Sequence, residues 1–132
     1  MSRENVEIVR GIYESIVRGE IEEVFPVLDP EIEWREPPES PGAGVYRGHE
    51  GVRRSYASWV ANWLEYRLEV EDLIEAGDHV LVRCRQRVRA KASGVEVEQT
   101  LFGAWTLRDG KAVRMRMYHD EAGALEAVGL RG

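Results

Sequence analysis

Two residues at the ends of strand-like segments have side chains suited to acid–base chemistry. Glu36 ends a short segment of alternating apolar and charged residues. His119 ends a second alternating segment, in which Met115 and Met117 share its face. A carboxyl group in an apolar pocket has a raised pKa and can act as a general base. Histidine titrates near neutrality. On opposite walls of one pocket, Glu36 and His119 would act as base and acid.

Both residues also have ordinary structural interpretations. Glu36 precedes a Pro-, Gly- and Ser-rich segment, residues 37–44, and a carboxylate in such a loop is often simply solvated. This segment is long enough to suggest a functional loop such as a lid. A histidine on an apolar face is more often a core residue with satisfied hydrogen bonds than a catalyst. The residues alone leave these alternatives open.

Further candidates would line the same pocket. Gln86 lies at an inward position of a predicted strand, and a buried amide requires either a structural hydrogen bond or a ligand. The two tyrosine candidates are expected to be core residues with hydroxyl groups able to reach the cavity, and the tryptophans are expected to form wall and core rather than a dedicated stacking site. Cys84 is expected to be an inert, buried thiol. The candidate substrate-contacting residues are Tyr13, Trp34, Tyr56, Trp59, Trp63, Gln86, Gly103, Met115 and Met117.

The Asp-Gly pair at 109–110 predicts a hairpin, because it lies between two alternating segments. A two-residue loop would turn the arginines of the second strand inward. A three-residue loop with a bulge pairs Leu107 with Val113 and Trp105 with Met115. We favour this second register because it keeps both apolar sets on one side of the sheet.

A second hairpin is predicted at Ser93-Gly94. A two-residue turn there pairs Arg89 with Glu98 and Lys91 with Glu96, which are opposite charges on the outer face. On the inner face the same register makes three further pairs: Gln86 with Leu101, Cys84 with Gly103, and Val82 with Trp105.

Apolar spacing predicts helices at about 3–18, 21–28, 50–64 and 121–128. Strands are predicted at 32–36, 45–48, 68–75, 79–92 and on both sides of residues 109–110, with turns at 29–30 and 76–78. The third helix includes Trp63, which continues the helical spacing of Tyr56 and Trp59. This order predicts an α+β fold, in which three N-terminal helices pack in the concave face of a curved antiparallel sheet. Sheet and helices would enclose a cone-shaped cavity.

The overall composition limits the functional classes. A chain of 132 residues fits one domain, residues 1–132. The net charge of −6 argues against a nucleic-acid partner. A single cysteine excludes an internal disulfide and a cysteine-based zinc site, and His49, His79 and His119 lack metal-ligand spacing, so we expect no metal. With no signal peptide and no long apolar segment, we expect a cytoplasmic protein without a membrane partner.

Five segments together carry a family resemblance: residues 29–35, 46–52, 75–80, 105–111 and 127–130. In this order they resemble the SnoaL-like polyketide cyclases, within the superfamily that also contains ketosteroid isomerases and nuclear transport factor two. The resemblance spans nearly the whole chain and implies the cone-shaped, cystatin-like fold, also described as an α+β barrel. It does not imply one activity, because this fold serves isomerases, cyclases, hydrolases, dehydratases and non-catalytic binders.

The resemblance assigns roles residue by residue. Steroid isomerases place a general-base Asp before a proline at the end of the first strand, where this chain has Glu36. Their helical tyrosines correspond to Tyr56 and, one residue away, to Tyr13. Their protonated oxyanion Asp corresponds to Gly103, so that acid is missing and steroid isomerase activity is not expected. The cyclases use an acidic residue near the end of the last strand, which points to Asp120 as a third catalytic candidate.

We therefore consider several functions. The first is a cofactor-free acid–base enzyme of the cyclase or isomerase type, acting on an apolar small molecule that contains a carbonyl group. The alternative is a non-catalytic module that binds an apolar small molecule or a protein partner. A hydrolase would need a carboxylate–arginine cluster inside the cone, and the outward arginines disfavour it. The resemblance also implies a homodimer through the outer sheet face, which carries arginines 83, 85, 87 and 89.

Overall fold

The computed structural model describes residues 2–37 and 44–130. The segment between them, where we predict a functional loop, lies outside the described residues. The helices are α1 (Ser2–Val17), the 3-10 helix η1 (Ile21–Val27), α2 (Gly48–Ala61) and α3 (Glu121–Ala127). The strands are β1 (Leu28–Arg35), β2 (Val45–Arg47), β3 (Trp63–Ala76), β4 (His79–Ala90), β5 (Glu96–Arg108) and β6 (Lys111–Tyr118).

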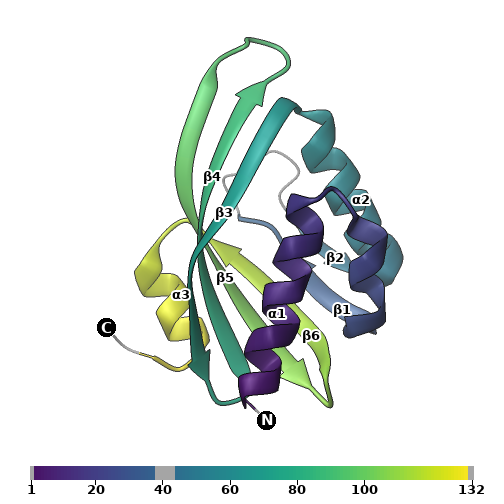
Figure 1. The fold of residues 1–132 in the computed structure, drawn as a ribbon, viewed down its shortest axis with the longest axis vertical. Coiled ribbons are helices and arrows are strands. Elements are labelled where there is room, and N and C mark those ends of the chain that lie inside the picture. Colours follow the sequence, from purple (N-terminus) through teal and green to yellow (C-terminus); the bar gives the residue numbers. More distant parts are fainter. Residues whose placement is uncertain (1, 38–43, 131–132) are drawn as a thin grey trace.

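Within the described residues, the strands form one curved sheet in the order β2-β1-β6-β5-β4-β3. Figure 1 shows α1 and α2 on one side of this sheet and α3 on the other. The predicted α+β fold with a curved sheet is confirmed. Two details differ: the sheet is not closed into a barrel, and β1 pairs with β6 in parallel rather than antiparallel. No hairpin joins these two strands, so turn chemistry could not reveal their direction.

The main core lies between the sheet and α1. Helix α1 buries Val9, Ile12, Tyr13 and Ile16, which recur at helical spacing, and Gly19 ends it with a positive φ of 75°. Val17, the last residue of the helix, is 51% exposed. A second, smaller core on the opposite sheet face packs Leu81, Phe102 and Ala104 against Ala124 of α3 and against Val128, the C-cap residue of that helix.

The junction between α2 and β3 differs from the prediction. Helix α2 ends at Ala61, so Trp63 is not helical but is the first residue of β3, where it pairs with Ala90. The pairing is irregular between Trp63 and Glu65, which identifies a bulge at Leu64. Trp63 follows Trp59 by four residues, so helical spacing could not distinguish the two assignments.

The β4–β5 hairpin has the predicted parity but a different register. Arg89 pairs with Glu96 and Arg87 with Glu98, two residues away from the predicted register. The connection between β4 and β5 is residues 91–95, five residues rather than two, and Gly94 within it has a φ of 71°. Because the shift is even, every side chain keeps its predicted face.

The β5–β6 hairpin combines features of both registers. Asp109 and Gly110 have φ values of 51° and 77°, as a two-residue type I′ turn requires. Leu107 therefore pairs with Ala112, not with Val113. A bulge beyond this pair restores the predicted partners Trp105 and Met115. The predicted bulge is thus present, but it lies within the strand pair instead of in the turn.

The predicted turn at Asp29-Pro30 is instead an irregular part of β1. The Asp29 carboxylate accepts a hydrogen bond from the Glu31 N–H at 2.8 Å. Pairing with β6 is interrupted between Leu28 and Glu33. A proline at this point is compatible with the strand because the ladder hydrogen bonds are missing there.

The arginines of β4 lie on the outer face, as predicted. Arg83, Arg85, Arg87 and Arg89 pair with glutamates of the neighbouring strands, at N–O distances of 2.6–4.0 Å. No carboxylate–arginine cluster of the kind a hydrolase would need is therefore formed by these residues inside the cone. Dimerisation through this face stays a prediction. None of the helices among the described residues is long and apolar enough to span a membrane.

Candidate functional site: a cavity with a half-buried carboxylate

A cavity of about 360 Å³ lies between the concave face of the sheet and helices α1 and α2. Ten of the sequence candidates line it: Tyr13, Trp34, Glu36, Tyr56, Trp59, Trp63, Gln86, Met115, Met117 and His119. Apolar side chains of the core, including Ile16, Leu68 and Leu101, complete much of the wall. Two candidates, Gly103 and Asp120, do not belong to the lining.

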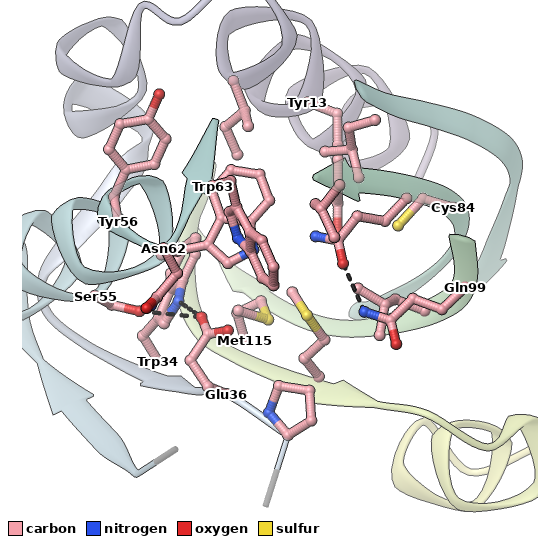
Figure 2. A pocket seen from close by; sticks show the side chains of 18 of the residues that line it. Tyr13, Trp34, Glu36, Ser55, Tyr56, Asn62, Trp63, Cys84, Gln99 and Met115 are labelled. Atoms are coloured by element: carbon pink, nitrogen blue, oxygen red, sulfur yellow. Dashed lines mark hydrogen bonds between the residues drawn. The ribbon is translucent and has the colours of Figure 1, made fainter. Parts of the chain in front are cut away.

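The Glu36 carboxylate is held by two hydrogen bonds. The Trp34 indole N–H donates to Oε2 at 2.7 Å, and the Ser55 hydroxyl donates to the same oxygen at 3.0 Å. Figure 2 shows the carboxylate beside these two residues, with both hydrogen bonds reaching one of its oxygens. Trp34 is itself fixed edge-to-face against Trp105, with ring centroids 5.6 Å apart. Glu36 is thus oriented by partners with little freedom to move.

The environment of Glu36 favours its neutral form. Burial raises the pKa of this carboxyl above the ordinary glutamate value, and the hydrogen bonds from Trp34 and Ser55 partly oppose the rise. A raised pKa brings a carboxylate closer to the range in which it accepts a proton efficiently at neutral pH. Glu36 therefore has the electrostatic character of a general base.

His119 and Glu36 line the same cavity, but not on opposite walls as predicted. β1 and β6 are neighbours and run in parallel, with Arg35 paired to Arg116. The C-terminal ends of both strands therefore lie at the same end of the sheet. Glu36 follows the end of β1 and His119 follows the end of β6, so the two side chains reach the cavity from adjacent strands.

Tyr13 brings a hydroxyl group to the wall formed by α1. The Trp105 indole N–H donates to this hydroxyl at 3.1 Å, which leaves the tyrosine hydrogen for another acceptor. Burial strongly raises the pKa of Tyr13, so the hydroxyl stays protonated. A Cβ added at Gly103 would lie 2.6 Å from the hydroxyl oxygen. Gly103 therefore makes room for Tyr13 rather than contacting a ligand.

Gln86 has a structural partner. The Gln99 amide donates to the Gln86 carbonyl oxygen at 2.7 Å, across the β4–β5 pair. The predicted register, which placed Leu101 opposite Gln86, concealed this contact. The pair satisfies a buried amide and still borders the cavity.

Asp120 caps a helix. Its carboxylate accepts a hydrogen bond from the Gly123 N–H at 2.8 Å, at the N-terminus of α3. The residue is exposed and does not line the cavity. Of the two carboxylates proposed from sequence, the structure brings only Glu36 together with His119.

The other two histidines also have partners. The His49 ring is half-buried: it lies 2.9 Å from the Leu28 carbonyl oxygen and packs against Phe25. The His79 ring lies 3.0 Å from the Thr106 hydroxyl. Among the described residues, no group of three or more His, Cys, Asp or Glu side chains is placed to hold a metal ion.

Sequence reasoning missed three polar residues of the lining: Ser55, Asn62 and Gln99. Ser55 could have been found, because it lies three residues after Val52 and one before Tyr56 on the same helical face. Gln99 required the correct hairpin register. Asn62 required the correct end of α2, since it is the C-cap residue of that helix.

Comparison with known proteins supports this description. Residues 9–115 match the model of the SnoaL-like domain. The fold is similar to that of TerC, which was co-crystallised with polyporic acid: the two are 28% identical, the TM-score is 0.79, and the match covers 96% of this chain and 98% of TerC. No curated protein matches the chain.

Two further structures are similar. An NTF2-like protein from Burkholderia thailandensis is 25% identical, with a TM-score of 0.83, over 92% of this chain and 95% of the other. A protein with a ketosteroid isomerase-like fold from Catenulispora acidiphila, in complex with trimethylamine, is 14% identical, with a TM-score of 0.75, over 94% and 93% of the two chains. The match over residues 9–115 and the shared fold show that this chain belongs to the SnoaL-like family.

Proposed function

We propose that this protein is a cofactor-free acid–base enzyme of the cyclase or isomerase type. Its substrate is an apolar small molecule with a carbonyl group. The observation that supports this most is the half-buried Glu36 carboxylate, oriented by Trp34 and Ser55 in the cavity that His119 also lines.

In this proposal Glu36 removes a proton from the carbon next to the carbonyl group. The electron pair of the broken C–H bond moves toward the carbonyl group. The product is an enolate whose negative charge lies largely on the carbonyl oxygen. His119 or the Tyr13 hydroxyl donates a hydrogen bond to that oxygen. In an isomerisation the proton on Glu36 then returns to a different carbon of the enolate. In a cyclisation the enolate carbon bonds to a second carbonyl carbon of the same molecule, and the oxygen released from that C=O π bond takes the proton from Glu36. The apolar wall excludes water and strengthens each of these interactions.

The similarity to TerC supports a small-molecule ligand. TerC, which is 28% identical to this chain over nearly the whole of both chains, was co-crystallised with polyporic acid. Polyporic acid is therefore a reasonable first ligand for binding measurements with this protein.

Proton exchange tests the proposal without knowledge of the natural substrate. We expect the protein to accelerate hydrogen–deuterium exchange at the carbons next to the carbonyl of 2-tetralone, followed by NMR in D2O. Glu36→Gln should lower the rate at least about a hundredfold. Glu31→Gln changes an exposed carboxylate of β1, the strand that Glu36 follows, and as the matched control it should retain the rate. Equal rates for Glu36→Gln and the wild type would exclude Glu36 as the base.

A non-catalytic binding module is the second candidate. It is favoured by Gly103, which stands where steroid isomerases have their oxyanion acid. Saturable binding of 2-tetralone or polyporic acid with no acceleration of exchange would support this candidate over the enzyme.

A further inference from the structure

We propose that the indole N–H of Trp63 donates a second hydrogen bond to the carbonyl oxygen of the bound ligand, beside the bond from His119 or Tyr13. The inference rests on the proposed function in one respect, because it assumes that the same cavity holds the ligand. It does not require turnover. It assigns to the ligand an apolar body with at least one acceptor oxygen.

The first observation is an unsatisfied donor. Nε1 of Trp63 is buried and has no hydrogen-bond partner, while Trp63 lines the cavity. Buried N–H groups in folded proteins nearly always have an acceptor, so an exception needs an explanation. The indoles of Trp34 and Trp105, which line the same cavity, donate to Glu36 and Tyr13. Trp63 differs from both in that its donor is unused.

The second observation is the bulge at Leu64. Between Tyr66 and Val70, β3 alternates regularly, so that Tyr66 and Leu68 face the cavity side, opposite Val88 and Gln86. Uninterrupted alternation would turn Leu64 inward and Trp63 outward. The bulge reverses this, so Trp63 joins the lining and Leu64 is 60% exposed. Bulges occur next to active sites, where they re-aim a side chain.

The third observation is the state of the other polar groups. Glu36 is bonded to Trp34 and Ser55, and Gln86 is bonded to Gln99. Figure 2 shows Trp63 in the middle of the lining, between the Glu36 group and Tyr13. A neutral N–H in an otherwise apolar region is satisfied by a ligand oxygen that offers a lone pair. A ketone oxygen meets this requirement and matches the chemistry available to Glu36.

Two matched probes test the inference. 2-Tetralone and tetralin share a bicyclic skeleton and differ by the carbonyl group. Trp63→Phe should weaken binding of 2-tetralone about fivefold, a ratio typical of one hydrogen bond, and change binding of tetralin less than about twofold. Trp59→Phe removes another indole of the lining and should weaken both probes equally.

An NMR measurement on the wild-type protein gives an independent readout. With the indole resonances assigned in the wild type, 2-tetralone should shift the Trp63 N–H signal downfield, and tetralin should not. An equal loss of affinity for both probes in Trp63→Phe would show a packing role only and overturn the inference. An unmoved Trp63 signal, or no saturable binding of 2-tetralone to the wild type, would overturn it as well.

The result is separable from the proposed function. Binding is measured at equilibrium, so loss of the ketone preference in Trp63→Phe would stand even if Glu36→Gln exchanged protons at the wild-type rate. Conversely, a strong effect of Glu36→Gln on exchange would stand if Trp63→Phe left both affinities unchanged.

Discussion

The Ser55 hydroxyl on α2 donates to the Glu36 carboxylate at 3.0 Å, although the two residues are 19 positions apart. This bond stabilises the ionised carboxylate and lowers its pKa, against the effect of burial. Ser55→Ala should therefore raise the pKa of Glu36 further. The acidic limb of the pH–rate profile should move to higher pH, and a carboxyl 13C titration should show the same shift. Ser58→Ala, on the same helix, is the control and should shift neither.

The pH dependence of stability provides a second test of Glu36. Its pKa in the folded protein is raised above 4.5, so the neutral form is favoured by folding. The stability that this group contributes is present below its unfolded pKa and is lost as the pH rises through its folded pKa. Each unit of pKa difference corresponds to about 1.4 kcal/mol.

Glu36→Gln removes this dependence. The free energy of unfolding of the variant minus that of the wild type should therefore increase as the pH rises from 4 to 8, as measured by urea denaturation. A difference between the two proteins that stays constant over this range would show that the fold leaves the pKa of Glu36 unchanged.

Gly103 and Tyr13 should be energetically coupled. The Cβ of Gly103→Ala would lie 2.6 Å from the Tyr13 hydroxyl oxygen and 3.0 Å from Nε1 of Trp105. We expect Gly103→Ala to lower the free energy of unfolding by about 1–3 kcal/mol. Tyr13→Phe removes the clashing oxygen, so the double variant should be more stable than the sum of the single effects predicts. Additive effects in thermal or urea unfolding would contradict the steric conflict.

Asp120 should matter for stability and not for chemistry. Its carboxylate caps α3, so Asp120→Ala should cost about 1 kcal/mol of unfolding free energy. Asp120→Asn keeps a capping oxygen and should be nearly as stable as the wild type. Both variants should exchange the protons of 2-tetralone at the wild-type rate. A large loss of rate in Asp120→Asn would return this residue to the catalytic candidates.

Cys84 should be unreactive in the native protein. Burial raises the pKa of its thiol to about 12, so about one thiol in ten thousand is ionised at pH 8. Reaction with an aromatic disulfide reagent at pH 8 should be very slow in buffer and fast in denaturant. Rapid native labelling would show that the cavity opens far enough to expose β4.

The parity of the strands could be predicted from sequence, whereas their exact pairing could not. Alternation along residues 80–88 assigned each side chain of β4 to the correct face. The connection after Ala90 is longer than a two-residue turn, and its charge pattern fits registers that differ by two residues. Arg89 finds a glutamate partner in both, so charge pairing could not select the observed one.

Residues of the candidate site could be predicted where the residue type alone distinguished them from their neighbours. Glu36 and His119 stand out as titratable groups among apolar neighbours. Their arrangement on adjacent strands was not predictable, because it depends on the parallel pairing of β1 and β6. For Trp63 and Ser55, the sequence did not reveal the feature that makes each residue important. A bulge leaves no clear mark on the sequence, and a single buried serine becomes informative only when its partner is known.

The parallel pairing of β1 and β6 also has a consequence for the order of folding. It joins Trp34 to Met115 and Arg35 to Arg116, residues that are far apart in the chain. Such distant pairing carries a high entropic cost of loop closure and is expected to slow folding. The local hairpins β3–β4, β4–β5 and β5–β6 can form before it. On this view the end of the sheet that carries Glu36 and His119 is completed late. A partly folded chain would already have the arginines of β4 paired with glutamates of β3 and β5, but Glu36 and His119 would not yet lie in one cavity.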